Sequence, residues 1–94
     1  MSLESRLLQA HVELQITPKD ENGTKAVSVA RRGSYDVRLV EAPQGFFVDV
    51  FLFWLELYDL DRKLSLDSGG ADDLEEALRL AQHLLAHAED LAKK

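Results

Sequence analysis

Two histidines and an aspartate near the C-terminus are the residues whose spacing is suited to binding a metal ion. His83 and His87 are four residues apart, and Asp90 follows three residues later. Imidazole nitrogens and a carboxylate spaced by one helical turn are common zinc ligands. Leu84, however, follows His83 where the helical motif of metalloproteases has a glutamate. The apolar pattern of this segment also places all three side chains on the solvent face, so we predict neither a metal site nor a cofactor.

Catalysis by a nucleophilic side chain has no support in the sequence. Cysteine is absent, which excludes disulfides, thiolate chemistry and cysteine-type zinc sites. The flanking glycines of a nucleophile elbow are missing at Ser28, Ser34, Ser65 and Ser68. Gly69-Gly70 precedes a predicted helix, where phosphates are often bound, but the acidic pair Asp72-Asp73 would repel a phosphate there. We therefore predict that the protein is not an enzyme.

A basic segment interrupts an otherwise acidic chain. The net charge is −6, which argues against a general nucleic-acid-binding protein. Residues 24–38 nevertheless contain four basic side chains and one acidic side chain, a local balance of +3. A patch of this kind would suit RNA or an anionic ligand, although a solvated strand and turn explains it more simply. The possible anion-binding residues are Lys25, Arg31, Arg32 and Arg38.

The last third of the chain, residues 72–94, has the pattern of one amphipathic helix. Asp72, followed three residues later by Glu75, matches a capping box at its start. Apolar residues then recur at steps of four and three, the spacing of a single helical stripe. The stripe consists of Leu74, Leu78, Ala81, Leu85, Ala88 and Ala92, and it is widened by Ala77, Leu84 and Leu91.

The segments before residue 46 have the patterns of a short helix and three strands. Residues 3–9 predict the helix, capped by Ser2, and the alternation of Val12, Leu14 and Ile16 predicts a half-buried strand. Further strands are expected over residues 25–31 and 35–41, with turns at 22–23, 32–34 and 42–45. The alternation of Leu64 and Leu66 with polar residues predicts a short last strand. Residues 67–70 are expected to form a flexible link.

The segment from Phe46 to Tyr58 is apolar on both faces of its predicted strand. One helix covers only one face of a sheet, so the second face needs a cover of its own. An uncovered apolar face marks an interface, which predicts a homodimer or a small protein partner. The alternative is a strongly coiled sheet that encloses this strand in a single core. The predicted interface residues are Phe51, Phe53, Trp54, Leu55 and Leu57.

Together these patterns predict a single α+β domain of 94 residues. We expect an antiparallel sheet of four to five strands with a long C-terminal helix packed on one face. The N-terminus lacks the features of a signal peptide. The longest uncharged apolar run, residues 50–55, is far too short to span a membrane. We therefore expect a cytoplasmic protein that associates with other protein chains, rather than with membranes or nucleic acids.

Two stretches resemble parts of the HicB-type antitoxins, whose small domain is a β-sheet with a packed helix. Residues 35–41 (YDVRLVE), followed by 45–50 (GFFVDV), are similar to the first hairpin of that family. Residues 72–78 (DDLEEAL) are similar to the start of its helix. The chain departs from the family at residues 51–58, where a segment with proline and glycine is expected. The resemblance implies binding of a small partner protein through the sheet, together with dimerisation.

Overall fold

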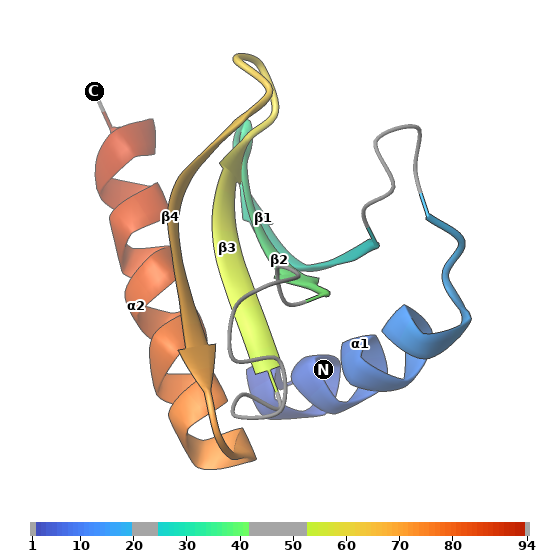
Figure 1. Ribbon diagram of the computed structural model, residues 1–94. Coiled ribbons are helices and arrows are strands. Elements are labelled where there is room, and N and C mark those ends of the chain that lie inside the picture. The colour runs from blue at the N-terminus through green and yellow to red at the C-terminus, as the bar shows by residue number, and fades with distance from the viewer. Residues whose placement is uncertain (1, 20–24, 42–52, 94) are drawn as a thin grey trace.

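The computed structural model describes residues 2–19, 25–41 and 53–93. Along the chain, one helix precedes four strands and a second helix follows them (Figure 1). The elements are α1 (Leu3–Ile16), β1 (Ala26–Arg32), β2 (Tyr35–Val40), β3 (Phe53–Asp59), β4 (Leu64–Ala71) and α2 (Leu74–Ala92). The strands form one antiparallel sheet in the order β1-β2-β3-β4. This is the α+β fold that the sequence predicts.

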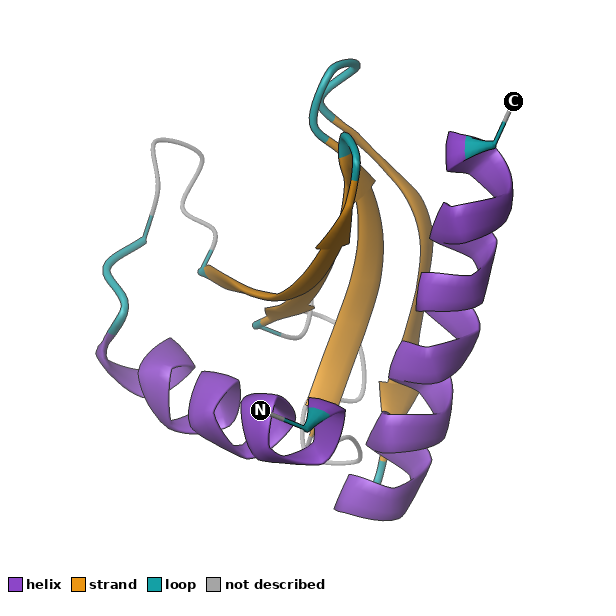
Figure 2. Cartoon of the chain, turned by 180° about the vertical axis from the view of Figure 1, so that it is seen from behind, coloured by secondary structure: helices purple, strands orange, loops and turns teal. Residues whose placement is uncertain are grey.

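The sheet is strongly bent, and the two helices pack on the same face of it. Figures 1 and 2 show α2 running along β3 and β4, while α1 crosses the end of the sheet where β1 curves away. The pairing of β1 with β2 shifts register between Ser28 and Ala30, which is a bulge and a usual cause of local bending. Within the described residues, neither helix combines the length and hydrophobicity needed to cross a membrane.

One hydrophobic core lies between the sheet and both helices. Alternate residues of β2 and β3 point into it, because successive side chains of a strand face opposite sides. Two residues of α1, five of α2, Val27 and Val29 of β1, and Ala71 of β4 complete it. The members from the two central strands and the helices are Val37, Leu39, Phe53, Leu55, Leu57, Leu7, Ala10, Ala77, Ala81, Leu84, Leu85 and Ala88.

The N-terminal segment is a single helix of 14 residues, so the strand predicted at residues 12–16 is wrong. Its start is as expected, since the Ser2 side chain accepts a hydrogen bond from the Ser5 N–H at 3.1 Å. The apolar residues of this helix form two stripes, and together these stripes produce the alternation at residues 12–16 that resembles a strand. The residues that pack on the core, Leu3, Leu7, Ala10 and Leu14, recur at helical steps of four and three. A second stripe on the opposite side contains Leu8, Val12 and Ile16.

The predicted strands at residues 25–31 and 35–41 are confirmed as β1 and β2 within one residue at each end. Gly33 lies in the turn between them with a φ of 61°, a left-handed conformation that glycine adopts without steric cost. The turns predicted at residues 22–23 and 42–45 lie outside the described residues. So does the first half of the two-sided apolar strand, residues 46–52.

The flexible link predicted at residues 67–70 is wrong, because these residues belong to β4. Gly69 pairs with Leu55 of β3 and faces α2. A Cβ atom at Gly69 would lie 3.2 Å from the Leu80 Cδ2 atom. The missing side chain therefore lets α2 approach the sheet closely, which is a packing role rather than a hinge.

The N-cap of α2 is one residue later than the sequence pattern indicates. The Asp73 side chain, rather than that of Asp72, caps the helix by accepting a hydrogen bond from the Glu76 N–H at 2.8 Å. The Glu76 Oε2 atom in turn accepts from the Asp72 N–H at 3.2 Å. Both aspartates are followed three residues later by a glutamate, so the sequence alone does not distinguish them.

The orientation of α1 is testable by shortening two neighbouring leucines. Leu7→Ala should lower the free energy of unfolding by about 2–5 kcal/mol, because Leu7 is fully buried and its loss leaves a cavity. Leu8→Ala should cost less than about 1 kcal/mol, since Leu8 lies on the outer side of the helix. Urea denaturation at low protein concentration, followed by circular dichroism, measures both values. Equal costs at the two positions would contradict this orientation.

A second pair of variants identifies the cap of α2. Asp73→Ala should lower the free energy of unfolding by about 1 kcal/mol, because it removes the side-chain acceptor of the Glu76 N–H. Asp72→Ala should change it by less than about 0.5 kcal/mol, since Asp72 contributes only its backbone N–H. Thermal denaturation of the two variants beside the wild type makes the comparison. A larger loss at Asp72 would place the cap where the sequence pattern alone put it.

Candidate functional site

Three of the predicted interface residues lie in the core of the chain. Phe53, Leu55 and Leu57 are 3%, 0% and 0% exposed. The Phe53 ring also contacts the His11 ring of α1, with 5.0 Å between the ring centroids. Trp54 is on the opposite face of β3 and is partly exposed. Phe51 lies outside the described residues. Phe53, Leu55 and Leu57 therefore offer no surface to a partner, as in the single-core alternative, whereas the interface role of Trp54 stays a prediction.

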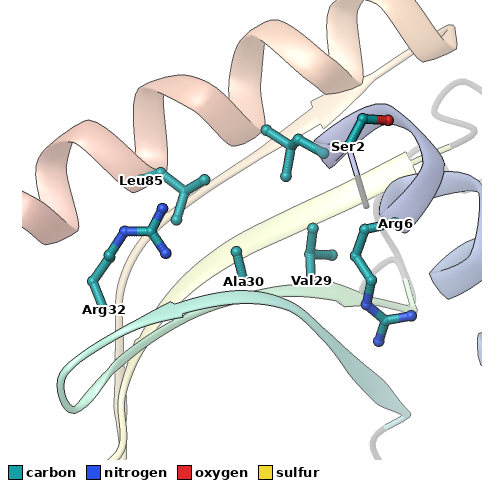
Figure 3. A pocket seen from close by; sticks show the side chains of 7 residues that line it. Ser2, Arg6, Val29, Ala30, Arg32 and Leu85 are labelled. Carbon is teal, nitrogen blue, oxygen red and sulfur yellow. The ribbon is translucent and has the colours of Figure 1, made fainter.

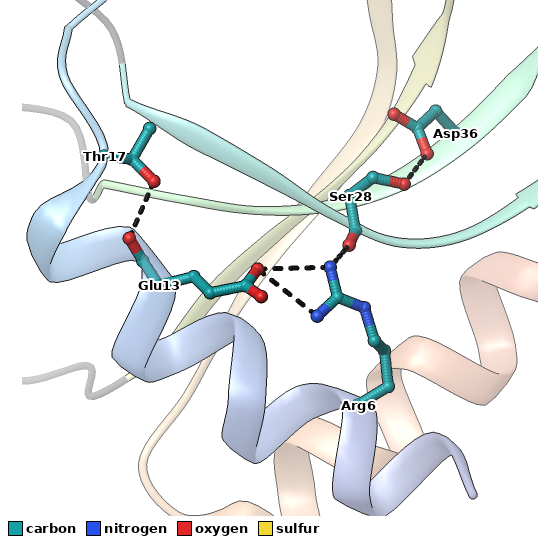
Figure 4. Close-up of polar contacts among 5 residues, drawn as sticks. All are labelled: Arg6, Glu13, Thr17, Ser28 and Asp36. Carbon is teal, nitrogen blue, oxygen red and sulfur yellow. Dashed lines mark hydrogen bonds and ion pairs between the residues drawn. The ribbon is translucent and has the colours of Figure 1, made fainter. Parts of the chain in front are cut away.

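The face of the sheet opposite both helices carries polar side chains that bind one another. The Arg38 Nε atom donates to the Glu56 Oε1 atom at 3.0 Å. The Arg38 guanidinium also stacks on Tyr58, with 3.9 Å from its carbon to the ring centroid. On the neighbouring strands, the Ser28 hydroxyl donates to the Asp36 Oδ1 atom at 2.6 Å (Figure 4). Arg38, Glu56 and Asp36 are therefore each bound by a group of the same chain.

The four possible anion-binding residues do not form one site. Successive side chains of a strand point to opposite faces, so Arg31 and Arg32 diverge. Arg31 lies beside Asp36 at 4.0 Å, on the same face as Arg38. Arg32 instead reaches α2, where its Nε atom is 3.2 Å from the Glu89 Oε1 atom. Lys25 precedes β1. Each of the three arginines therefore already faces a carboxylate.

An open pocket of about 350 Å³ lies between the start of α1, β1 and α2 (Figure 3). Two arginines, Arg6 and Arg32, flank it. Arg6 donates to the Glu13 Oε2 atom at 3.3 Å and to the Ser28 carbonyl (Figure 4), while Arg32 is paired with Glu89. Both cations are thus engaged by groups of the same chain, which weakens the case for an anionic ligand. The pocket is lined by Ser2, Leu3, Arg6, Val29, Ala30, Arg32 and Leu85.

The histidines of α2 border a second open pocket, of about 380 Å³, against β4. Its lining includes Asp67, which the sequence analysis did not associate with His83, His87 and Asp90. The His87 Nδ1 atom lies 3.9 Å from the Asp67 Oδ2 atom. In the described part of the chain, no three metal-ligating side chains are grouped so that they could hold an ion.

The most unusual surface is an apolar stripe along the outer side of α1. Leu8, Val12 and Ile16 are 48%, 63% and 81% exposed. They lie four residues apart, so they form one continuous row on the helix. Among the described residues, the one other large hydrophobic side chain of comparable exposure is Leu64. We refer to Leu8, Val12 and Ile16 as the outer stripe of α1.

Sequence reasoning missed the outer stripe because it assigned Val12 and Ile16 to the buried face of a strand. The signal was nevertheless present, since two rows with helical spacing run through residues 3–16 on opposite sides. One row belongs to a normal amphipathic helix of a monomer. Two rows leave one apolar side of the helix outside the core.

Comparison of the chain with protein-family models, with curated proteins and with solved structures found no match. The candidate site therefore rests on the geometry of this chain alone.

Because its arginines are paired with carboxylates, the protein is expected to bind polyanions weakly. The wild type should pass through a heparin column at about 0.15 M salt, because the net charge is negative and the arginine charges face carboxylates. A fluorescent RNA oligonucleotide titrated at the same salt should show no saturable binding. Retention that disappears in the double variant Arg31→Ala/Arg32→Ala would instead favour a function in anion binding.

Proposed function

We propose that this protein is a non-catalytic cytoplasmic module that acts by protein–protein association, and that its contact surface is the outer stripe of α1. The observation that carries the proposal is the alignment of Leu8, Val12 and Ile16 opposite the core, with exposures of 48%, 63% and 81%. No cofactor is part of the proposal. The resemblance to HicB-type antitoxins, a family with small protein partners, points to the same class of function.

The physical argument starts from the cost of leaving these side chains in water. Burying a large aliphatic side chain is worth about 1.5–3 kcal/mol. Single exposed leucines or valines are ordinary on protein surfaces and carry no meaning. A row at steps of four residues is different, because it presents one continuous apolar surface to a groove or to another helix. Such rows recur where helices dock on partners.

The outer stripe replaces the interface that the sequence analysis placed on β3. The need for a protein partner was inferred there from a strand with two apolar faces. Over Phe53–Leu57, α1 and α2 cover the face of Phe53, Leu55 and Leu57, and the other face carries Trp54 and Glu56. The alternative function, binding of RNA or an anionic ligand through residues 25–38, receives less support. Its arginines are paired with carboxylates and divided between the two faces of the sheet.

A co-purification experiment tests the association surface. The tagged chain is produced in its native cells beside an untagged copy, and retained proteins are quantified by mass spectrometry. The same is done with the double variant Val12→Ser/Ile16→Ser. At least one defined protein, either the untagged copy or another chain, should be retained by the wild type and lost with the variant. Binding of that protein is then reproduced with purified components.

The matched control is Gln82→Ser, a substitution on the exposed side of α2. This variant should retain the same proteins as the wild type. Circular dichroism and urea denaturation verify that all baits are folded, since serine at two exposed positions should leave the core intact. If the wild type and the double variant retain the same proteins in equal amounts, the outer stripe is not an association surface.

A further inference from the structure

Two histidines of α2 line the pocket that this helix forms against β4. His83 and His87 are four residues apart, so their side chains lie on the same side of the helix, one turn from each other. Asp67 of β4 and Asp90 of α2 line the same pocket of about 380 Å³. Figure 1 shows β4 running beside α2. The pocket therefore combines two imidazoles and two carboxylates from two elements.

Asp67 supplies what the helix alone lacks, a carboxylate that orients one of the rings. Its Oδ1 atom accepts a hydrogen bond from the Ser68 N–H at 2.9 Å, which holds the carboxylate in place. Its Oδ2 atom lies 3.9 Å from the His87 Nδ1 atom. Histidine ligands usually direct their second ring nitrogen to a carboxylate, which fixes the ring. The Nε2 atom of His87 is then the one left for a metal ion.

The kind of donor atom selects the class of metal ion. Imidazole nitrogens suit zinc, copper and nickel, whereas magnesium and calcium prefer oxygen ligands. Two histidines at this spacing on one helix can bind the same ion, because their side chains lie one above the other. Water fills the remaining positions around the ion. Such a site does not need three ligating side chains, a grouping that is absent from the described residues.

The charges at the pocket favour a cation. The lining contains the carboxylates of Asp67 and Asp90 and neither a lysine nor an arginine. Arg79, the one arginine or lysine within α2, lies one turn before His83 and does not line the pocket. The chain as a whole has a net charge of −6. A divalent cation is therefore attracted both by the pocket and by the molecule around it.

We infer that His83 and His87 bind one divalent transition-metal ion, of the class of Zn²⁺, through their Nε2 atoms, and that Asp67 acts as the positioning residue of His87. The site is independent of the proposed association surface, because it lies on α2 and β4 rather than on α1. An ion held here binds the folded chain, in which β4 brings Asp67 to α2. Zinc should therefore raise the melting temperature.

Calorimetric titration of the purified chain, without a histidine tag, with zinc chloride tests the site. The wild type should bind one Zn²⁺ ion per chain, and His83→Gln or His87→Gln should each remove saturable binding. Asp67→Asn should weaken binding about 10-fold or more, since it removes the carboxylate that orients the ring. Glu75→Gln makes the same change of charge at an exposed position of α2 and should bind zinc like the wild type.

Long-range ¹H–¹⁵N spectra of the histidine rings identify the nitrogen that binds the ion. Zinc should shift the Nε2 signals of His83 and His87 and leave those of His11, on α1, unchanged. Circular dichroism verifies that every variant is folded. A wild type without saturable zinc binding, or binding that survives in both histidine variants, would overturn the site. Equal affinities of Asp67→Asn and Glu75→Gln would overturn the role of Asp67 and reduce the pair to a chelating surface without a pocket.

Discussion

The burial of one face of a bent sheet is the constraint on which the rest of this structure depends. Leu55 and Leu57 of the third strand are fully buried, and so are the residues beside them on the second strand. A single helix cannot cover a sheet that curves away at one edge. The long α2 covers β3 and β4, which leaves the curved end of β1 to α1 (Figure 2). The two helices therefore divide the cover of the sheet between them, although α2 also contacts β1 and β2.

Small residues make this arrangement possible. Ala77, Ala81 and Ala88 of α2 have no exposed surface, and Gly69 faces the same helix from β4. Short side chains on both sides bring the helix axis close to the sheet, where the Leu80 side chain lies against Gly69. The core side of α1 uses Leu7 and Ala10 in the same way. Among the described residues, the outer stripe of α1 is not part of the hydrophobic core, and it is the surface that we propose for association.

Much of the fold was predictable from local patterns, and the failures have physical causes. The amphipathic period of α2 and the alternation of β1 and β2 identified those elements, because each buries a single face. The segment at residues 12–16 was misassigned because its two apolar rows imitate the alternation of a strand. Gly69 was assigned to a flexible link because the close approach of a helix is not visible in sequence. The outer stripe of α1 was not predicted from these local patterns. Which side of α1 is exposed depends on how the helix is rotated against the sheet.

The polar contacts on the uncovered face of the sheet have a consequence for how the chain reaches this fold. Asp36 is buried, and its carboxylate accepts a hydrogen bond from Ser28 while facing Arg31 on the adjacent strand. A one-residue slip of β1 against β2 would turn both donors to the opposite face. The carboxylate would then be buried without a partner, which is strongly unfavourable. Asp36 thus selects a single strand register among those that the small apolar residues of β1 would tolerate.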